Sequence, residues 1–86
     1  MEEWATFEAA LQLIPLNKNI TRGQKEALYW LTVKGETYKQ VALRFRVLEP
    51  TIRVRVRTAA QAVGAESNRS LLDQLLICFG RALERK

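Results

Sequence analysis

Hydrophobic side chains recur every three or four residues near the N-terminus, at Trp4, Phe7, Leu11 and Ile14. This spacing predicts an amphipathic helix, because residues three or four apart share one side of a helix. Glu2 and Glu3 favour its first turn, and Pro15 stops its continuation. We therefore predict an N-terminal helix within residues 1–16.

Two further helix starts carry the same capping pattern, a threonine followed three residues later by a glutamine. Thr21 precedes Gln24, and Thr37 precedes Gln40. In such a pair, each side chain accepts a hydrogen bond from the backbone N–H of the other residue. Gly35 lies between the two patterns and suits the end of the earlier helix. The short spacing predicts a tight angle between these two helices.

Residues 51–57 admit two interpretations. They alternate β-branched and charged side chains, which is typical of a half-buried strand. A longer window favours a helix, because the apolar positions then form a continuous stripe at Ile52, Val56, Ala59, Ala60 and Val63. A lone strand would also have no partner. We predict a helix over residues 49–63, with Pro50 tolerated in its first turn.

A last helix is predicted over residues 67–84, with Ser67 as its N-cap. Its apolar surface is wider than one core contact requires. An exposed apolar face favours pairing with a second copy, which small folds often use to gain stability. We predict a homodimer interface at Leu72, Leu75, Leu76, Phe79 and Leu83.

These patterns together predict an all-α fold. We expect a compact bundle of about five helices that contains a helix-turn-helix and forms a single domain over residues 1–86.

The positive charge of the chain is concentrated in one segment. The chain has 14 lysines and arginines against 9 acidic residues, a formal net charge of +5. Between residues 44 and 57, Glu49 is the only acid and five arginines occur, at Arg44, Arg46, Arg53, Arg55 and Arg57. Such a cluster favours a polyanionic partner, because unpartnered arginines repel one another. The alternative is a solvated basic helix with no ligand.

On the helix predicted over residues 49–63, Arg53 and Arg57 share an outward face with Val54 and Gln61. Guanidinium and amide groups of this kind can read base edges in the major groove of DNA. Residues 20–64 are therefore predicted to form a DNA-binding core. Its candidate DNA-binding residues are Thr37, Lys39, Arg44, Arg46, Glu49, Thr51, Arg53, Val54, Arg55, Arg57, Thr58 and Gln61.

Residues 20–72 resemble the LuxR/GerE-type helix-turn-helix domain. The matching segments are Ile20-Thr21, Leu28 to Gly35, Lys39-Gln40-Val41-Ala42, Thr51-Ile52-Arg53, Gly64-Ala65, Asn68-Arg69 and Leu71-Leu72. The resemblance implies a helix at 37–46 that crosses the DNA backbone, a recognition helix at 49–63 and a dimerising helix at 67–84. Arg46 stands where the family usually has a turn glycine, and Leu48 where it has a capping Ser or Thr. The chain is also similar to small plasmid and fimbrial repressors and to region four of sigma factors.

We therefore expect a sequence-specific transcriptional regulator of double-stranded DNA, acting as a homodimeric repressor on a palindromic operator. RNA polymerase or another regulator is a further candidate partner. One alternative is an anti-activator that keeps this fold and sequesters another regulator. A non-specific, nucleoid-type DNA binder is a third interpretation.

Several classes of function lack the residues they need. The chain has one cysteine, Cys78, and no histidine, which excludes an intrachain disulfide and a Cys/His zinc site. No glycine-rich phosphate loop occurs, so we expect no enzyme, no cofactor and no metal. No apolar run approaches the roughly 20 residues that span a bilayer. Met1-Glu2-Glu3 lacks the positive start of a signal peptide, and a cytoplasmic protein is expected.

Overall fold

The computed structural model describes residues 2–14 and 20–84, and within these ranges it contains helices and no strand. The helices are α1 (Glu2–Leu11), α2 (Arg22–Thr32), α3 (Tyr38–Phe45), α4 (Glu49–Ala62) and α5 (Asn68–Glu84). The predicted all-α bundle is confirmed. None of these helices combines the length and apolar character needed to cross a bilayer.

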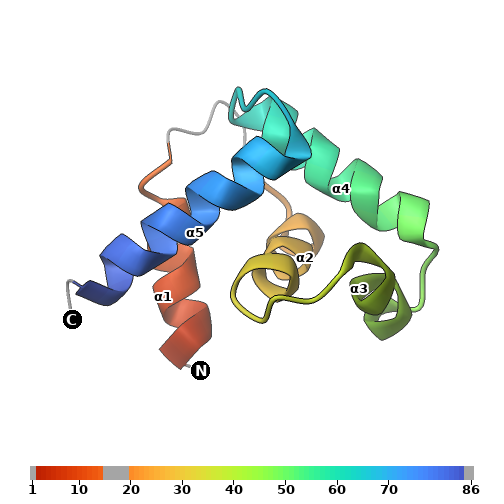
Figure 1. Cartoon of the computed structure of the whole chain (residues 1–86), viewed down its shortest axis with the longest axis horizontal. Helices are drawn as coiled ribbons and strands as arrows, with labels where there is room; N and C mark the ends of the chain where they lie inside the picture. The colour runs from red at the N-terminus through yellow and green to blue at the C-terminus, as the bar shows by residue number, and fades with distance from the viewer. Residues whose placement is uncertain (1, 15–19, 85–86) are drawn as a thin grey trace.

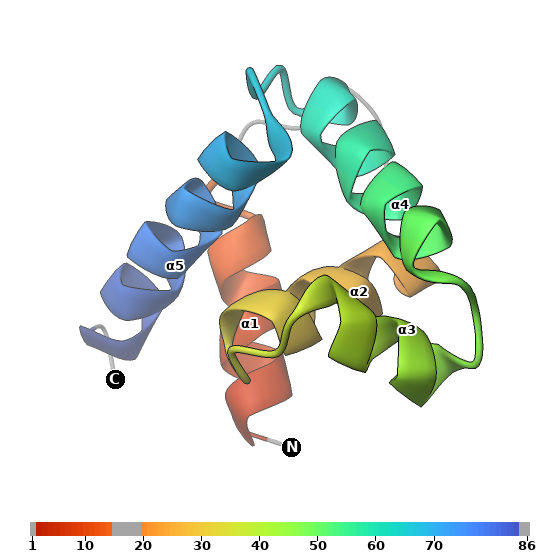
Figure 2. The ribbon, with the colours of Figure 1, turned by 45° about the vertical axis from the view of Figure 1, so that its right-hand side comes forward.

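Helices α1 and α5 lie side by side on one side of the molecule, and α3 and α4 lie on the other (Figures 1 and 2). Helix α2 contacts α3, α4 and α5 and so links the two sides. This arrangement leaves the outer surfaces of α3 and α4 away from α1.

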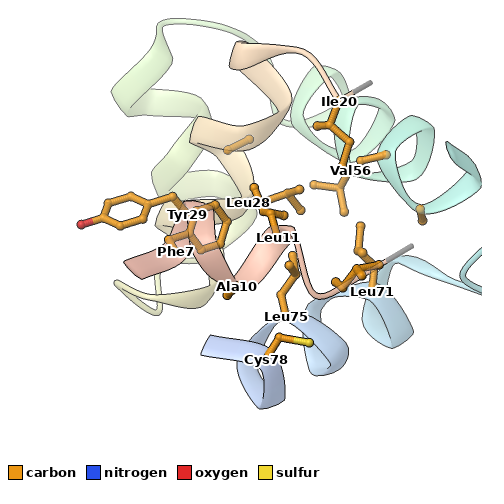
Figure 3. Packing of buried hydrophobic residues seen from close by; sticks show 14 of the residues in the cluster. Phe7, Ala10, Leu11, Ile20, Leu28, Tyr29, Val56, Leu71, Leu75 and Cys78 are labelled. Carbon is orange, nitrogen blue, oxygen red and sulfur yellow. The ribbon is translucent and has the colours of Figure 1, made fainter. Parts of the chain in front are cut away.

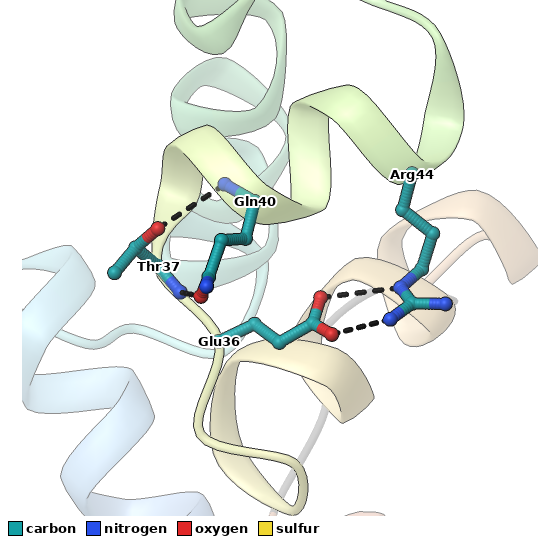
Figure 4. Close-up of polar contacts among 4 residues, drawn as sticks. All are labelled: Glu36, Thr37, Gln40 and Arg44. Atoms are coloured by element: carbon teal, nitrogen blue, oxygen red, sulfur yellow. Dashed lines mark hydrogen bonds and ion pairs between the residues drawn. The ribbon is translucent and has the colours of Figure 1, made fainter.

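Both capping boxes form as the sequence predicts. The Thr21 Oγ1 atom accepts a hydrogen bond from the Gln24 backbone N–H at 3.2 Å, and the Gln24 Oε1 atom accepts one from the Thr21 N–H at 2.9 Å. The equivalent distances at Thr37 and Gln40 are 3.1 and 2.9 Å (Figure 4). Ser67 also caps α5, because its Oγ atom accepts from the Ser70 N–H at 3.1 Å. Each cap satisfies N–H groups that have no partner inside the helix.

The ambiguous segment after residue 48 is helical. Its alternating pattern is overridden because four apolar side chains of α4 meet the core along a helical stripe, at Ile52, Val56, Ala59 and Ala60. Pro50 lies in the first turn, where its missing N–H has no helical partner to lose. The helix ends at Ala62, one residue before the predicted end.

The first helix is shorter than predicted. Helix α1 ends at Leu11, and residues 12–14 continue in tighter turns in which each N–H donates to the carbonyl oxygen three residues earlier. Pro15 in the sequence favours an early ending, because a proline has no N–H to bond the carbonyl oxygen four residues earlier, that of Leu11. A proline also disfavours helical backbone at the residue before it, here Ile14. Ile14 is still buried, at 5 % exposure. The end predicted at residue 16 lies outside the described residues.

The core joins all five helices (Figure 3). Phe7 of α1 packs edge-on against Tyr29 of α2, with ring centroids 5.5 Å apart, and both are buried. Leu71 and Leu75 bring α5 onto the same cluster. Cys78 is buried there too, as expected for a thiol within the apolar surface of this helix. The outer surfaces of α3 and α4 are therefore fixed on a packed base.

Candidate nucleic-acid interface

Residues 46–48 join α3 to α4, a connection of the length found in helix-turn-helix motifs. Arg46 has left-handed backbone angles, φ 57° and ψ 43°. Its N–H donates to the Leu43 carbonyl oxygen at 3.3 Å, and the Val47 N–H donates to the Ala42 carbonyl oxygen at 3.0 Å. These two bonds form a Schellman motif, which usually has glycine at the left-handed position. Here an arginine adopts the left-handed position that glycine usually occupies.

Leu48 is the N-cap of α4, and its side chain makes no capping hydrogen bond. It is also 76 % exposed. The Thr51 N–H donates instead to the Leu48 carbonyl oxygen at 3.0 Å. The turn therefore holds its shape through backbone bonds, and neither Arg46 nor Leu48 has a side chain suited to its backbone position.

The outward face of α4 carries most of the predicted DNA-binding residues. Ile52 and Val56 point into the core, so the opposite face of the helix meets solvent. The predicted DNA-binding residues that are exposed on this helix are Thr51, Arg53, Val54, Arg57, Thr58 and Gln61, and Arg55 is half-buried at the edge. The structure brings these seven residues together on one helix.

Arg44 is exposed but is paired with Glu36 of the same chain (Figure 4). Its Nε atom donates to Glu36 Oε1 at 3.1 Å, and its Nη2 atom donates to Glu36 Oε2. The guanidinium carbon lies 3.8 Å from the centroid of the Trp30 ring. These hydrogen bonds lower the pKa of the Glu36 carboxyl and raise the pKa of Arg44. Glu36 therefore compensates most of the charge of Arg44 within the chain.

Arg53 is also engaged. Its Nε and Nη2 atoms both donate to Glu49 Oε2, at 3.2 Å, and its guanidinium carbon lies 4.3 Å from the Tyr38 ring centroid. The side-chain amide of Asn68 donates to the Arg53 carbonyl oxygen at 3.3 Å, which ties α5 to α4. Glu49, a predicted DNA-binding residue, acts here as the partner of an arginine.

Four other predicted cations form no ion pair among residues 2–14 and 20–84: Lys39, Arg46, Arg55 and Arg57. Lys39, Arg46 and Arg57 are exposed. The α3–turn–α4 surface therefore keeps uncompensated positive charge. Thr37 is exposed, and its hydroxyl oxygen serves the capping box.

The predicted dimer surface needs one correction. Leu75 is fully buried in the core of its own chain, at 0 % exposure, and is not on the outer face of α5. It belongs to the buried stripe with Leu71, Cys78 and Ala82. The neighbouring stripe remains accessible, because Leu76 and Leu83 are each 49 % exposed while Leu72 and Phe79 are half-buried.

Sequence reasoning missed the two aromatic rings that hold arginines, Trp30 and Tyr38. Trp30 and Arg44 lie in different helices, so no fixed spacing in the sequence signals their contact. Within the described ranges, no group of three acidic or sulfur ligands could hold a metal ion.

A scan against protein-family models gave no match for this chain, and searches of curated proteins and of solved structures gave none either.

Proposed function

We propose that the chain binds double-stranded DNA by placing the outward face of α4 in the major groove. The observation that carries this proposal is the exposed, cationic face of α4 directly after the three-residue turn, with Arg57 unpaired among the described residues. A helix of this diameter fits the major groove, where base edges present distinct donors, acceptors and methyl groups. No acidic side chain lies on that face beyond Glu49, which Arg53 already engages.

The cations on this surface have two places to act. Arg46 and Lys39 lie on the turn and on α3, beside α4, and suit contacts with phosphate oxygens. Arg55 lies at the edge of α4 and suits phosphate also. Arg57 lies on the exposed face, where its guanidinium can reach either a phosphate or a base edge. Phosphate contacts position the helix, and base contacts give the sequence preference.

More specifically, we propose that the chain is a transcriptional repressor that acts as a homodimer. The accessible apolar stripe of α5, around Leu76 and Leu83, would pair two copies. A two-fold dimer presents two copies of α4 to a palindromic site, with half-sites about 10 base pairs apart. Repression is favoured because a bound dimer can block a promoter simply by occupying it.

The test is selection of duplexes from a random DNA pool at about 150 mM salt, followed by anisotropy titration of the enriched duplex against a scrambled one. We expect at least a hundredfold preference for the enriched duplex. The double variant Arg55→Ala, Arg57→Ala should abolish this preference, whereas Arg81→Ala, an exposed arginine on α5, should keep it. Equal, weak binding to both duplexes by the unaltered protein would refute specific DNA binding.

The exposed leucines of α5 favour a second function, sequestration of another regulator by an anti-activator. Leu76 and Leu83 are half exposed on the accessible stripe, an arrangement that also fits a heterologous helix. Two variants separate the functions. Arg55→Ala with Arg57→Ala should spare capture of a partner protein, and Leu76→Lys should abolish it.

A further inference from the structure

The outward face of α4 has an uncharged centre. Thr51, Val54, Thr58 and Gln61 are three or four residues apart, so they form one stripe along the exposed side of the helix. Arg55 lies about 100° around the helix axis from Val54 in one direction, and Arg57 about 60° in the other. The stripe is therefore neutral, with Arg55 on one side and Arg57, followed by Arg53, on the other.

Val54 is the apolar member of that stripe, and it is 60 % exposed. The core of α4 is already filled by its four buried side chains, so Val54 has no packing role in the isolated chain. The arginine one residue earlier is not free to replace it at the centre, because Arg53 is held by Glu49 and lies against the Tyr38 ring. The centre of the face thus presents the methyl groups of Val54. An arginine at this position would instead present a guanidinium, which recognises guanine.

We propose that Val54 contacts the 5-methyl group of a thymine, so that each half-site is read through a T·A pair at its centre. This inference rests on the proposed binding of α4 in the major groove. The thymine methyl is the apolar feature of that groove, and small aliphatic side chains recognise it by contact. Gln61, seven residues along the same stripe, lies two turns from Val54 and faces the same way.

The test removes the methyl group from either side of the contact. Each thymine of the selected duplex is replaced in turn by deoxyuridine, which keeps base pairing and lacks only the 5-methyl group. We expect one replacement in each half-site to weaken binding of the unaltered protein by about fourfold, the effect of one buried methyl group. For Val54→Ala, the same replacement should have no effect, because the side chain no longer reaches it.

A matched control is Ile77→Ala, which also truncates an exposed β-branched side chain, here on α5 at 58 % exposure. It should keep the full methyl effect. If a specific duplex is selected but no deoxyuridine replacement distinguishes the unaltered protein from Val54→Ala, the thymine contact is refuted and DNA binding by α4 stands. If no duplex is enriched, the proposed function itself fails, and this inference fails with it.

Discussion

Helices α4 and α5 bury their inner stripes in the same core, yet their outer faces differ. On α4, the face opposite Ile52 carries threonines, a valine, a glutamine and arginines. On α5, the stripe beside the buried Leu75 carries leucines and a phenylalanine. The inner stripes explain why both helices form. The two partners proposed above differ accordingly, one being anionic and hydrated and the other apolar.

The two faces also differ in how many of their side chains already have partners within the chain. Arg44 and Arg53 on the α3–α4 side are held by Glu36 and Glu49, so the arginine cluster is only partly available. Leu76 and Leu83 on α5 stay about half exposed in the described part of the chain. Apolar surface of this kind is stabilised only by burial, not by an ion pair. Substitutions on each face should therefore change different measurements.

The largest effect is expected on the free energy of unfolding, when a residue of the inner stripe of α5 is truncated and compared with its neighbour on the outer stripe. Leu75→Ala removes a fully buried side chain and should lower the free energy of unfolding by about 2–5 kcal/mol. Leu76→Ala, one residue along, should change it by less than about 0.5 kcal/mol in the monomer. Urea denaturation at low protein concentration measures both. Similar losses for both variants would show that Leu76 packs inside the chain.

The second effect concerns pairing. Leu76→Lys places a charge at the proposed dimer surface, twice in a two-fold interface, and should raise the dimer dissociation constant at least about tenfold. Ile77→Lys is the matched control, because Ile77 is also exposed on α5 but points away from the stripe. Analytical ultracentrifugation over a range of concentrations gives both constants. A protein that is monomeric without any substitution would refute the homodimer.

Most of the fold was predictable from local patterns. Thr21 and Thr37 start their helices as predicted, because a capping box is formed by residues three apart and needs no distant partner. Residues 51–57 needed the longer window, because the strand-like alternation is local while burial of Val56 depends on other helices. The end of α1 was predicted too late, since tightening of a last turn leaves no mark on hydrophobic spacing.

The sequence predicted which residues form the candidate DNA-binding surface, but not which of its arginines pair with other side chains of the chain. The sequence placed Arg44, Arg53 and Arg57 in one cluster of candidate DNA-binding cations. The structure separates them, because Trp30 and Glu36 reach Arg44 from another helix and a loop. Leu75 was assigned to the dimer surface for a related reason. Two adjacent apolar stripes on one helix look alike until the position of α1 decides which of them is covered.

A smaller effect is expected at Arg46, where stability and binding should change in opposite directions. A non-glycine residue in the left-handed region costs roughly 1–2 kcal/mol, partly offset in a glycine variant by the greater freedom of the unfolded chain. Arg46→Gly should therefore stabilise the fold by up to about 1 kcal/mol and reduce the salt dependence of DNA binding by about one phosphate contact. Arg46→Ala should show the loss in binding without the gain in stability. If Arg46→Gly binds DNA as tightly as the unaltered protein, the side chain contacts no phosphate.

The smallest effect is a pH dependence at Glu36. Arg44 lowers the pKa of the Glu36 carboxyl below its unfolded value, so the ionised carboxylate stabilises the fold at neutral pH. That contribution is lost as the pH falls through the lowered pKa in the folded state, below the ordinary glutamate value of about 4.3. Glu36→Gln removes the charge at every pH. Its melting temperature should fall below that of the unaltered protein at pH 7, and the two should converge in acid.

Glu66→Gln is the control for this titration, because Glu66 is exposed and forms no ion pair among the described residues. Its melting temperature should follow that of the unaltered protein throughout. The difference in melting temperature between the unaltered protein and Glu36→Gln could instead stay constant from pH 7 into acid. That outcome would mean that the charge of Glu36 does not contribute to stability, and that Trp30 alone holds Arg44. If the difference is instead lost in acid, the DNA affinity of Glu36→Gln is informative, because Arg44 released from its carboxylate adds a cation to the α3–turn–α4 surface.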